Sequence, residues 1–218
     1  MIFSMEKMMG FCSGLWQMIG INMCFLLCNI PALFFLIFVG ADQVGNYLPF
    51  FLLCLLPLGV SLSALFYSMF RFRKEKDISV ISTFFKAYRS NFKQSTAISF
   101  LEIGFLFVMT MNIRFFTTVF PMAFMRIFFQ ILMFFILLLT PYFYMLAMRY
   151  ELKIRDIFKN ALILAIGRPL LLLGNTATFF FVLVLYEIMP GTAILFIGSI
   201  YGYLIIYMNQ KVFSSMEE

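Results

Sequence analysis

The sequence contains no histidine. Histidine is the side chain that most often acts as a general acid or base near neutral pH, and it is the commonest ligand for transition metals. The sequence also lacks a phosphate-binding glycine loop, a nucleophile elbow, an HExxH pattern and an EF-hand loop. These absences predict a protein that is not an enzyme and that needs no cofactor.

Charged residues are also scarce, at 12% of the chain, whereas soluble domains carry about 25%. Hydrophobic residues make up 63% of the sequence, and the mean hydropathy is +0.99. This composition predicts an integral membrane protein that contacts the lipid bilayer. The net charge of +6 does not indicate a nucleic-acid partner, because most basic residues lie in short connectors beside apolar runs, where membrane topology explains them.

The sequence has only four cysteines, and their surroundings are mostly apolar, so they do not indicate a disulfide framework. Three of the four cysteines lie inside apolar runs, and Cys24 and Cys28 are one helical turn apart. Buried cysteine usually behaves as a small hydrophobic residue, so we predict no metal site.

Long apolar runs alternate with short polar connectors along the whole chain. This alternation predicts an all-α fold, a polytopic transmembrane bundle that forms one membrane domain over residues 1–218. About six spans are expected, at residues 16–39, 49–70, 95–111, 122–148, 161–186 and 192–208, with amphipathic connectors at 71–94 and 149–160.

The distribution of lysine and arginine predicts the orientation of these spans. The connectors 71–94 and 149–160 carry seven and four basic residues, whereas the other three loops carry none, one and none. Cytoplasmic loops carry the excess of basic residues in membrane proteins. Both connectors and both termini are therefore expected on the cytoplasmic side.

The first connector is the most charged stretch of the chain, and its apolar residues recur every three or four positions. This pattern predicts an amphipathic helix, which either lies in the headgroup plane of an anionic leaflet or packs as a hairpin between two spans. The residues expected to contact lipid or a cytoplasmic partner are Arg71, Arg73, Lys74, Lys76, Phe85, Lys86, Tyr88, Arg89, Asn91, Phe92 and Lys93.

Two charged residues lie deep inside the apolar runs. Glu102 and Arg168 each follow the last lysine of a connector by nine residues, which places both roughly 13 Å into the bilayer. Buried charges need partners, so opposite charges at matched depth predict an intramembrane ion pair. The pair either locks two spans together or lines a polar cavity with Asn22 and Asn29.

The segment FFKAYRSNFKQ at residues 84–94 resembles the YesL-like family of bacterial membrane proteins of unknown function. The sequences ALFY at 64–67 and KNAL at 159–162, together with Asn22 and Pro31, extend the resemblance. The family signature corresponds here to Phe85, Tyr88, Asn91 and Phe92. Members are commonly encoded beside carbohydrate-uptake ABC transporters.

The resemblance therefore implies a multi-pass protein of the bacterial cytoplasmic membrane that assists such a transporter, through its permease or ATPase subunits. An independent small-solute permease, which would use the region of Glu102 and Arg168, is the alternative.

Overall fold

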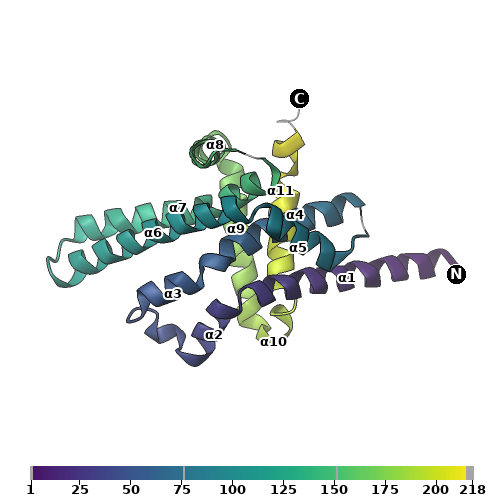
Figure 1. Cartoon of the computed structure of the whole chain (residues 1–218), viewed down its shortest axis with the longest axis horizontal. Helices are drawn as coiled ribbons and strands as arrows, with labels where there is room; N and C mark the ends of the chain where they lie inside the picture. The colour runs from purple at the N-terminus through teal and green to yellow at the C-terminus, as the bar shows by residue number, and fades with distance from the viewer. Residues whose placement is uncertain (1, 76, 151, 215–218) are drawn as a thin grey trace.

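The computed structural model describes residues 2–75, 77–150 and 152–214 (Figure 1). These residues form helices and connecting turns, with no β-strand among them. The elements in chain order are α1 (Ile2–Cys28), α2 (Ile30–Phe38), η1 (Ala41–Gln43), α3 (Leu48–Cys54), α4 (Leu56–Glu75), α5 (Val80–Ser90), α6 (Phe92–Thr118), α7 (Ala123–Arg149), α8 (Ile154–Gly167), α9 (Pro169–Ile188), α10 (Pro190–Ala193) and α11 (Ile197–Ser214).

Prolines mark several of the places where one helix ends and the next begins. Pro31, Pro49, Pro169 and Pro190 each occupy the first turn of a helix, where the missing N–H needs no partner. Each of these prolines would break an i to i−4 hydrogen bond if the preceding helix continued through it. The predicted first span is accordingly two helices, α1 and α2, which meet at Asn29.

Helix α4 forms the centre of the molecule and contacts α1, α5, α6, α7 and α11. Its inner face combines fully buried large residues, such as Phe66 and Met69, with the small residues Ser61, Ser63 and Ala64. Small side chains let helix backbones approach closely inside a membrane, where apolar burial alone gives little drive for association. The composition of α4 therefore explains why several helices converge on it.

The prediction of a membrane protein is confirmed in outline, because the described residues include five helices long and apolar enough to cross a membrane. These are Lys7–Cys28, Leu48–Glu75, Phe92–Thr118, Ala123–Arg149 and Pro169–Ile188. The predicted sixth span corresponds to α11, which is not among the five. The predicted fifth span, 161–186, is divided at Gly167–Pro169 into α8 and α9, and α8 already begins inside the connector predicted at 149–160.

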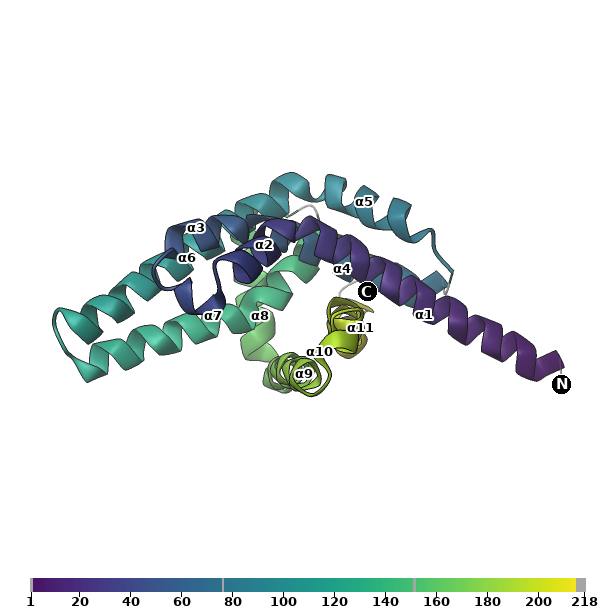
Figure 2. The same ribbon diagram turned by 90° about the horizontal axis from the view of Figure 1, so that it is seen from below.

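The longest helices run in two main directions, whereas Figure 1 shows the shorter α8 nearly end-on. Helices α6 and α7 form a long hairpin that extends to one side of the core, while α1 extends to the other side (Figure 1). Helices α9 and α11 pack together and run across them, so that Figure 2 shows these two nearly end-on while α1, α6 and α7 lie in the plane of the view. Membrane spans share the bilayer normal within a modest tilt. The arrangement therefore does not confirm six parallel spans.

Two side-chain hydrogen bonds join connecting segments that lie far apart in the sequence. The guanidinium of Arg114, near the end of α6, donates to the carbonyl oxygen of Gly45 in the loop before α3. Among the basic connectors, Gln94 Nε2 donates to the carbonyl oxygen of Leu152 over 2.7 Å. Each of these hydrogen bonds therefore joins two segments that the distribution of lysine and arginine predicts on the same side of the membrane.

Candidate functional site

The first basic connector folds into the end of α4, a short loop, α5 and the first turn of α6. Helix α5 packs against α4 and α1, and it buries Phe84 and Ala87 in that contact. The amphipathic helix predicted from the spacing of apolar residues is therefore present, and one of its faces belongs to the core.

The cations of this connector have different surroundings. Arg71 forms a 2.7 Å ion pair with Glu75 on the same helix. Arg73 lies over the rings of Tyr203 and Tyr207 and donates a 2.7 Å hydrogen bond to Gln210, so it fastens α11 to α4. The exposed cations of the connector are Lys74, Lys86, Arg89 and Lys93. Lys76 lies outside the described residues.

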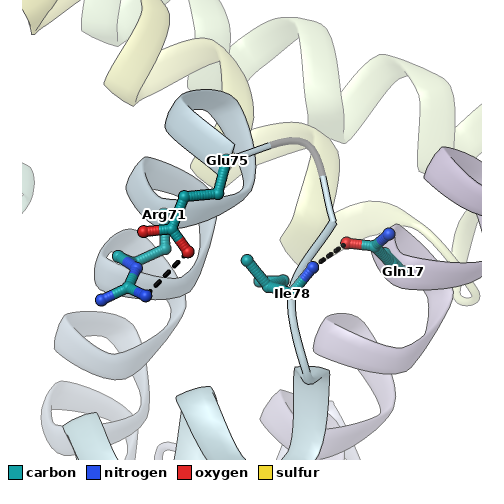
Figure 3. Close-up of polar contacts among 4 residues, drawn as sticks. All are labelled: Gln17, Arg71, Glu75 and Ile78. Atoms are coloured by element: carbon teal, nitrogen blue, oxygen red, sulfur yellow. Dashed lines mark hydrogen bonds and ion pairs between the residues drawn. The ribbon is translucent and has the colours of Figure 1, made fainter.

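Gln17 on α1 holds the loop that leads into α5 (Figure 3). Its side-chain oxygen accepts a 3.1 Å hydrogen bond from the backbone N–H of Ile78, and its Nε2 donates to Asp77 Oδ1 over 3.0 Å. The amide is buried, so these bonds are shielded from competing water. Close packing supports them, because a Cβ on Gly20 would lie 3.1 Å from Val80 Cγ1.

We expect the substitution Gln17→Leu to loosen this loop. The N–H of Ile78 would lose its acceptor, at a cost of about 1–2 kcal/mol, and amide exchange in residues 77–85 would accelerate about tenfold. Hydrogen–deuterium exchange of the detergent-solubilised protein measures this rate. Gln130→Leu, at an exposed position on α7, serves as the control and leaves exchange in 77–85 unchanged. Equal exchange in both variants would contradict the role of Gln17.

The signature aromatic residues of the connector form one continuous row. The ring centroids of Phe85 and Tyr88 are 6.5 Å apart, and those of Tyr88 and Phe92 are 5.8 Å apart. Burial raises the pKa of the Tyr88 hydroxyl, and the nearby Cys28 raises it further. Asn91 is the single residue between α5 and α6, and its N–H donates to the carbonyl oxygen of Ala87. The four residues named by the resemblance thus form the corner where α5 turns into α6.

A second group of interest surrounds the carboxyl group of Glu102, which is only 7% exposed. Tyr144 donates a 2.8 Å hydrogen bond to Glu102 Oε2, and Thr140 donates to Oε1. The Tyr144 hydroxyl also lies 3.0 Å from Ser99 Oγ. Both carboxyl oxygens therefore have hydroxyl partners from α7, as a buried carboxyl group requires.

Sequence reasoning found Glu102 but missed these partners. The signal was present in the spacing: Ser95, Ser99 and Glu102 lie on one face of α6, and Thr140 and Tyr144 lie one turn apart on α7. Ser95 continues the polar contact to α4, where its Oγ donates to Ser63 Oγ over 3.0 Å. Ser99, Thr140 and Tyr144, together with the carboxyl group of Glu102, are called the hydroxyl cluster below.

Arg168, the predicted partner of Glu102, lies at the break between α8 and α9 with an exposed side chain. The hydrogen bonds of the Glu102 carboxyl group run to α7 instead. The ion pair between Glu102 and Arg168 stays a prediction, and a double charge swap that rescues the two single charge reversals would support it.

The two asparagines proposed for a polar cavity both connect helices. Asn22 Nδ2 donates to the carbonyl oxygen of Ile194 over 2.8 Å, and its Oδ1 accepts from the N–H of Gly198 over 2.9 Å. Asn29 Nδ2 donates to Ser61 Oγ over 2.8 Å. Asn22 thus fastens α1 to the start of α11 and the turn before it, and Asn29 fastens the junction of α1 and α2 to α4.

An apolar cavity of about 410 Å³ lies between α4, α7, α9 and α11. Leucine and phenylalanine side chains form most of its wall, and neither Asn22 nor Asn29 lines it. Thr140, which lines this cavity, also belongs to the hydroxyl cluster. Thr140 therefore lies between the buried carboxyl group of Glu102 and the apolar cavity.

Comparison with known proteins adds one finding to this geometry. Residues 18–113 match the family model described as "Protein of unknown function, DUF624". This is the YesL-like family, so the resemblance is confirmed for that part of the chain. The match includes α5, the aromatic row and Glu102. The chain matches no curated protein and no solved structure.

Proposed function

We propose that the whole chain is a YesL-like protein of the bacterial cytoplasmic membrane and that it assists a carbohydrate-uptake ABC transporter without being an enzyme. Support comes from the match over residues 18–113 and from the genomic association that the resemblance implies. The excess of lysine and arginine in both connectors favours a cytoplasmic position for them and for both termini. A reporter fused after Asp42 that proved cytoplasmic would contradict this orientation.

The observation that carries this proposal is that the two basic connectors contact each other and that each exposes cations on the surface. Lys74 is exposed on the first connector, and Lys153 and Arg155 are exposed on the second. The hydrogen bond from Gln94 to Leu152 holds the two connectors side by side. Such a surface suits an acidic patch on a permease or ATPase subunit, because complementary charge selects partners and speeds their association.

Copurification of the tagged protein in mild detergent tests this proposal. We expect permease and ATPase subunits of one ABC transporter to copurify in stoichiometric amounts, and we expect the pair Lys74→Glu and Arg155→Glu to reduce their recovery about tenfold. Arg126→Glu is the matched control, since Arg126 is exposed at the start of α7, remote from both connectors in sequence. Recovery of the protein without transporter subunits, or equal losses in both variants, would contradict the proposal.

An independent small-solute permease is the second candidate, and the hydroxyl cluster beside the apolar cavity favours it. Buried carboxyl groups at mid-membrane depth often mark substrate or ion paths. Flux of sugar or another small solute into vesicles that contain only the purified protein, lost on Glu102→Gln, would support this candidate over the accessory role.

A further inference from the structure

Helix α5 has three faces rather than the two of an ordinary surface helix. Phe84 and Ala87 are buried against α4 and α1. Next to that packed face runs a stripe of large apolar side chains that stay substantially exposed in the described chain: Ile81 is 69% exposed and Phe85 is 40% exposed. Arg89 and Lys86 are exposed on the third face. A helix that only packed into a cytoplasmic hairpin would not need the second face.

The apolar stripe of α5 continues directly into a candidate membrane span. Phe92, in the first turn of α6, is 47% exposed and stands 5.8 Å from the ring of Tyr88, which connects it to Phe85. Farther along α6, Phe100 is 66% exposed. Because α6 is long and apolar enough to cross a membrane, its exposed phenylalanines face hydrocarbon, and the stripe on α5 is an extension of that surface.

The position of α5 in the chain sets its level in the membrane. It follows the candidate span that ends at Glu75 and is separated from α6 by Asn91 alone. It packs alongside α4 and α1, and its cations belong to the basic connector that the charge pattern places at the cytoplasmic headgroups. Three exposed cations, Lys86, Arg89 and Lys93, recur at helical spacing on the face beside the apolar stripe.

We infer that α5 is an interfacial helix that binds anionic phospholipids. Ile81, Phe85 and Phe92 insert at the level of the first acyl carbons, and Lys86, Arg89 and Lys93 contact the lipid phosphates. Apolar side chains beside cations match the boundary between acyl chains and headgroups. Continuity with the apolar surface of α6 favours lipid over a soluble protein at the stripe. This inference does not depend on the proposed transporter partner.

Fluorescence quenching by brominated lipids tests the insertion. The background variant is Trp16→Phe, which removes the one native tryptophan. The reporter Phe85→Trp is compared with Ser90→Trp, a position exposed on α5 away from the stripe. Each variant is reconstituted alone into vesicles with lipids brominated near the top of the acyl chain. We expect quenching of the Phe85→Trp reporter to exceed that of Ser90→Trp at least about twofold.

The headgroup preference is tested in vesicles of phosphatidylcholine, with or without about one third phosphatidylglycerol. Brominated phosphatidylglycerol is expected to quench the reporter more than brominated phosphatidylcholine does, and the triple variant Lys86→Glu, Arg89→Glu, Lys93→Glu is expected to lose this preference. Ile81→Trp repeats the measurement if Phe85→Trp does not fold. Equal quenching at the stripe and at Ser90 would overturn the inference. Equal quenching by the two headgroups would overturn the anionic preference. The purified protein is used alone, so neither result depends on a transporter.

Discussion

Replacing Gly59 by alanine is expected to destabilise the protein strongly, although it adds only one methyl group. A Cβ at this position would lie 1.8 Å from Ser99 Oγ and 2.4 Å from the Tyr144 hydroxyl oxygen. Both atoms belong to the hydroxyl cluster and cannot move without losing hydrogen bonds. Overpacking of this kind costs about 1–3 kcal/mol, and the lost hydrogen bonds add to that cost. Unfolding of the detergent-solubilised protein by heat or by denaturing detergent measures the effect.

Gly104→Ala provides the matched control for this substitution. Gly104 lies on α6, two residues after Glu102, and a Cβ there would meet nothing within 4 Å. Alanine also favours a helix over glycine by about 1 kcal/mol, so Gly104→Ala is expected to be neutral or slightly stabilising. Similar stability of the two alanine variants would show that the hydroxyl cluster is not packed against α4 as described.

The second large effect is expected from Tyr144→Phe. This change removes the donor to Glu102 Oε2 and the contact with Ser99, while it keeps the ring. Leaving the buried carboxyl group with only one hydrogen-bond donor lowers the free energy of unfolding by about 1–3 kcal/mol. Because the two residues form one network, the double variant Glu102→Leu, Tyr144→Phe should lose less stability than the sum of the single losses, by about 0.5–3 kcal/mol. A full unfolding cycle with the four proteins measures this coupling.

Tyr142→Phe is the control, since Tyr142 is equally buried, two residues away on α7, but its hydroxyl has no hydrogen-bond partner in the described part of the chain. Removal of that hydroxyl is expected to leave stability unchanged or to raise it. If Tyr142→Phe destabilised the protein as much as Tyr144→Phe, loss of a ring hydroxyl rather than loss of the Glu102 bond would explain both results.

The sequence predicted local features well because local forces determine them. Pro31 and Pro169 mark helix starts regardless of what packs nearby, and the three-to-four spacing of Phe84, Phe85 and Tyr88 predicted α5. The burial of Glu102 also followed from its place in an apolar run. None of these predictions required knowledge of which helices become neighbours.

The partner of Glu102 could not be predicted in the same way. Its hydroxyl donors lie 38 and 42 residues away on another helix, and only the packing of α6 against α7 brings them together. The argument for Arg168 assumed straight spans that share one direction. The break between α8 and α9, and the crosswise direction of α9, remove the basis for assigning the two residues equal depth.

The bonds of Asn22 have a consequence for biosynthesis. Its partners Ile194 and Gly198 are 172 and 176 positions farther along the chain. When α1 leaves the ribosome, neither partner has been translated, and an amide without a partner is costly in hydrocarbon. The first long helix therefore cannot reach its final surroundings until the last helix has been made. A nascent chain stalled before Ile194 would hold α1 in a provisional position, open to quality-control proteases, and the last helix would complete the folding of the first.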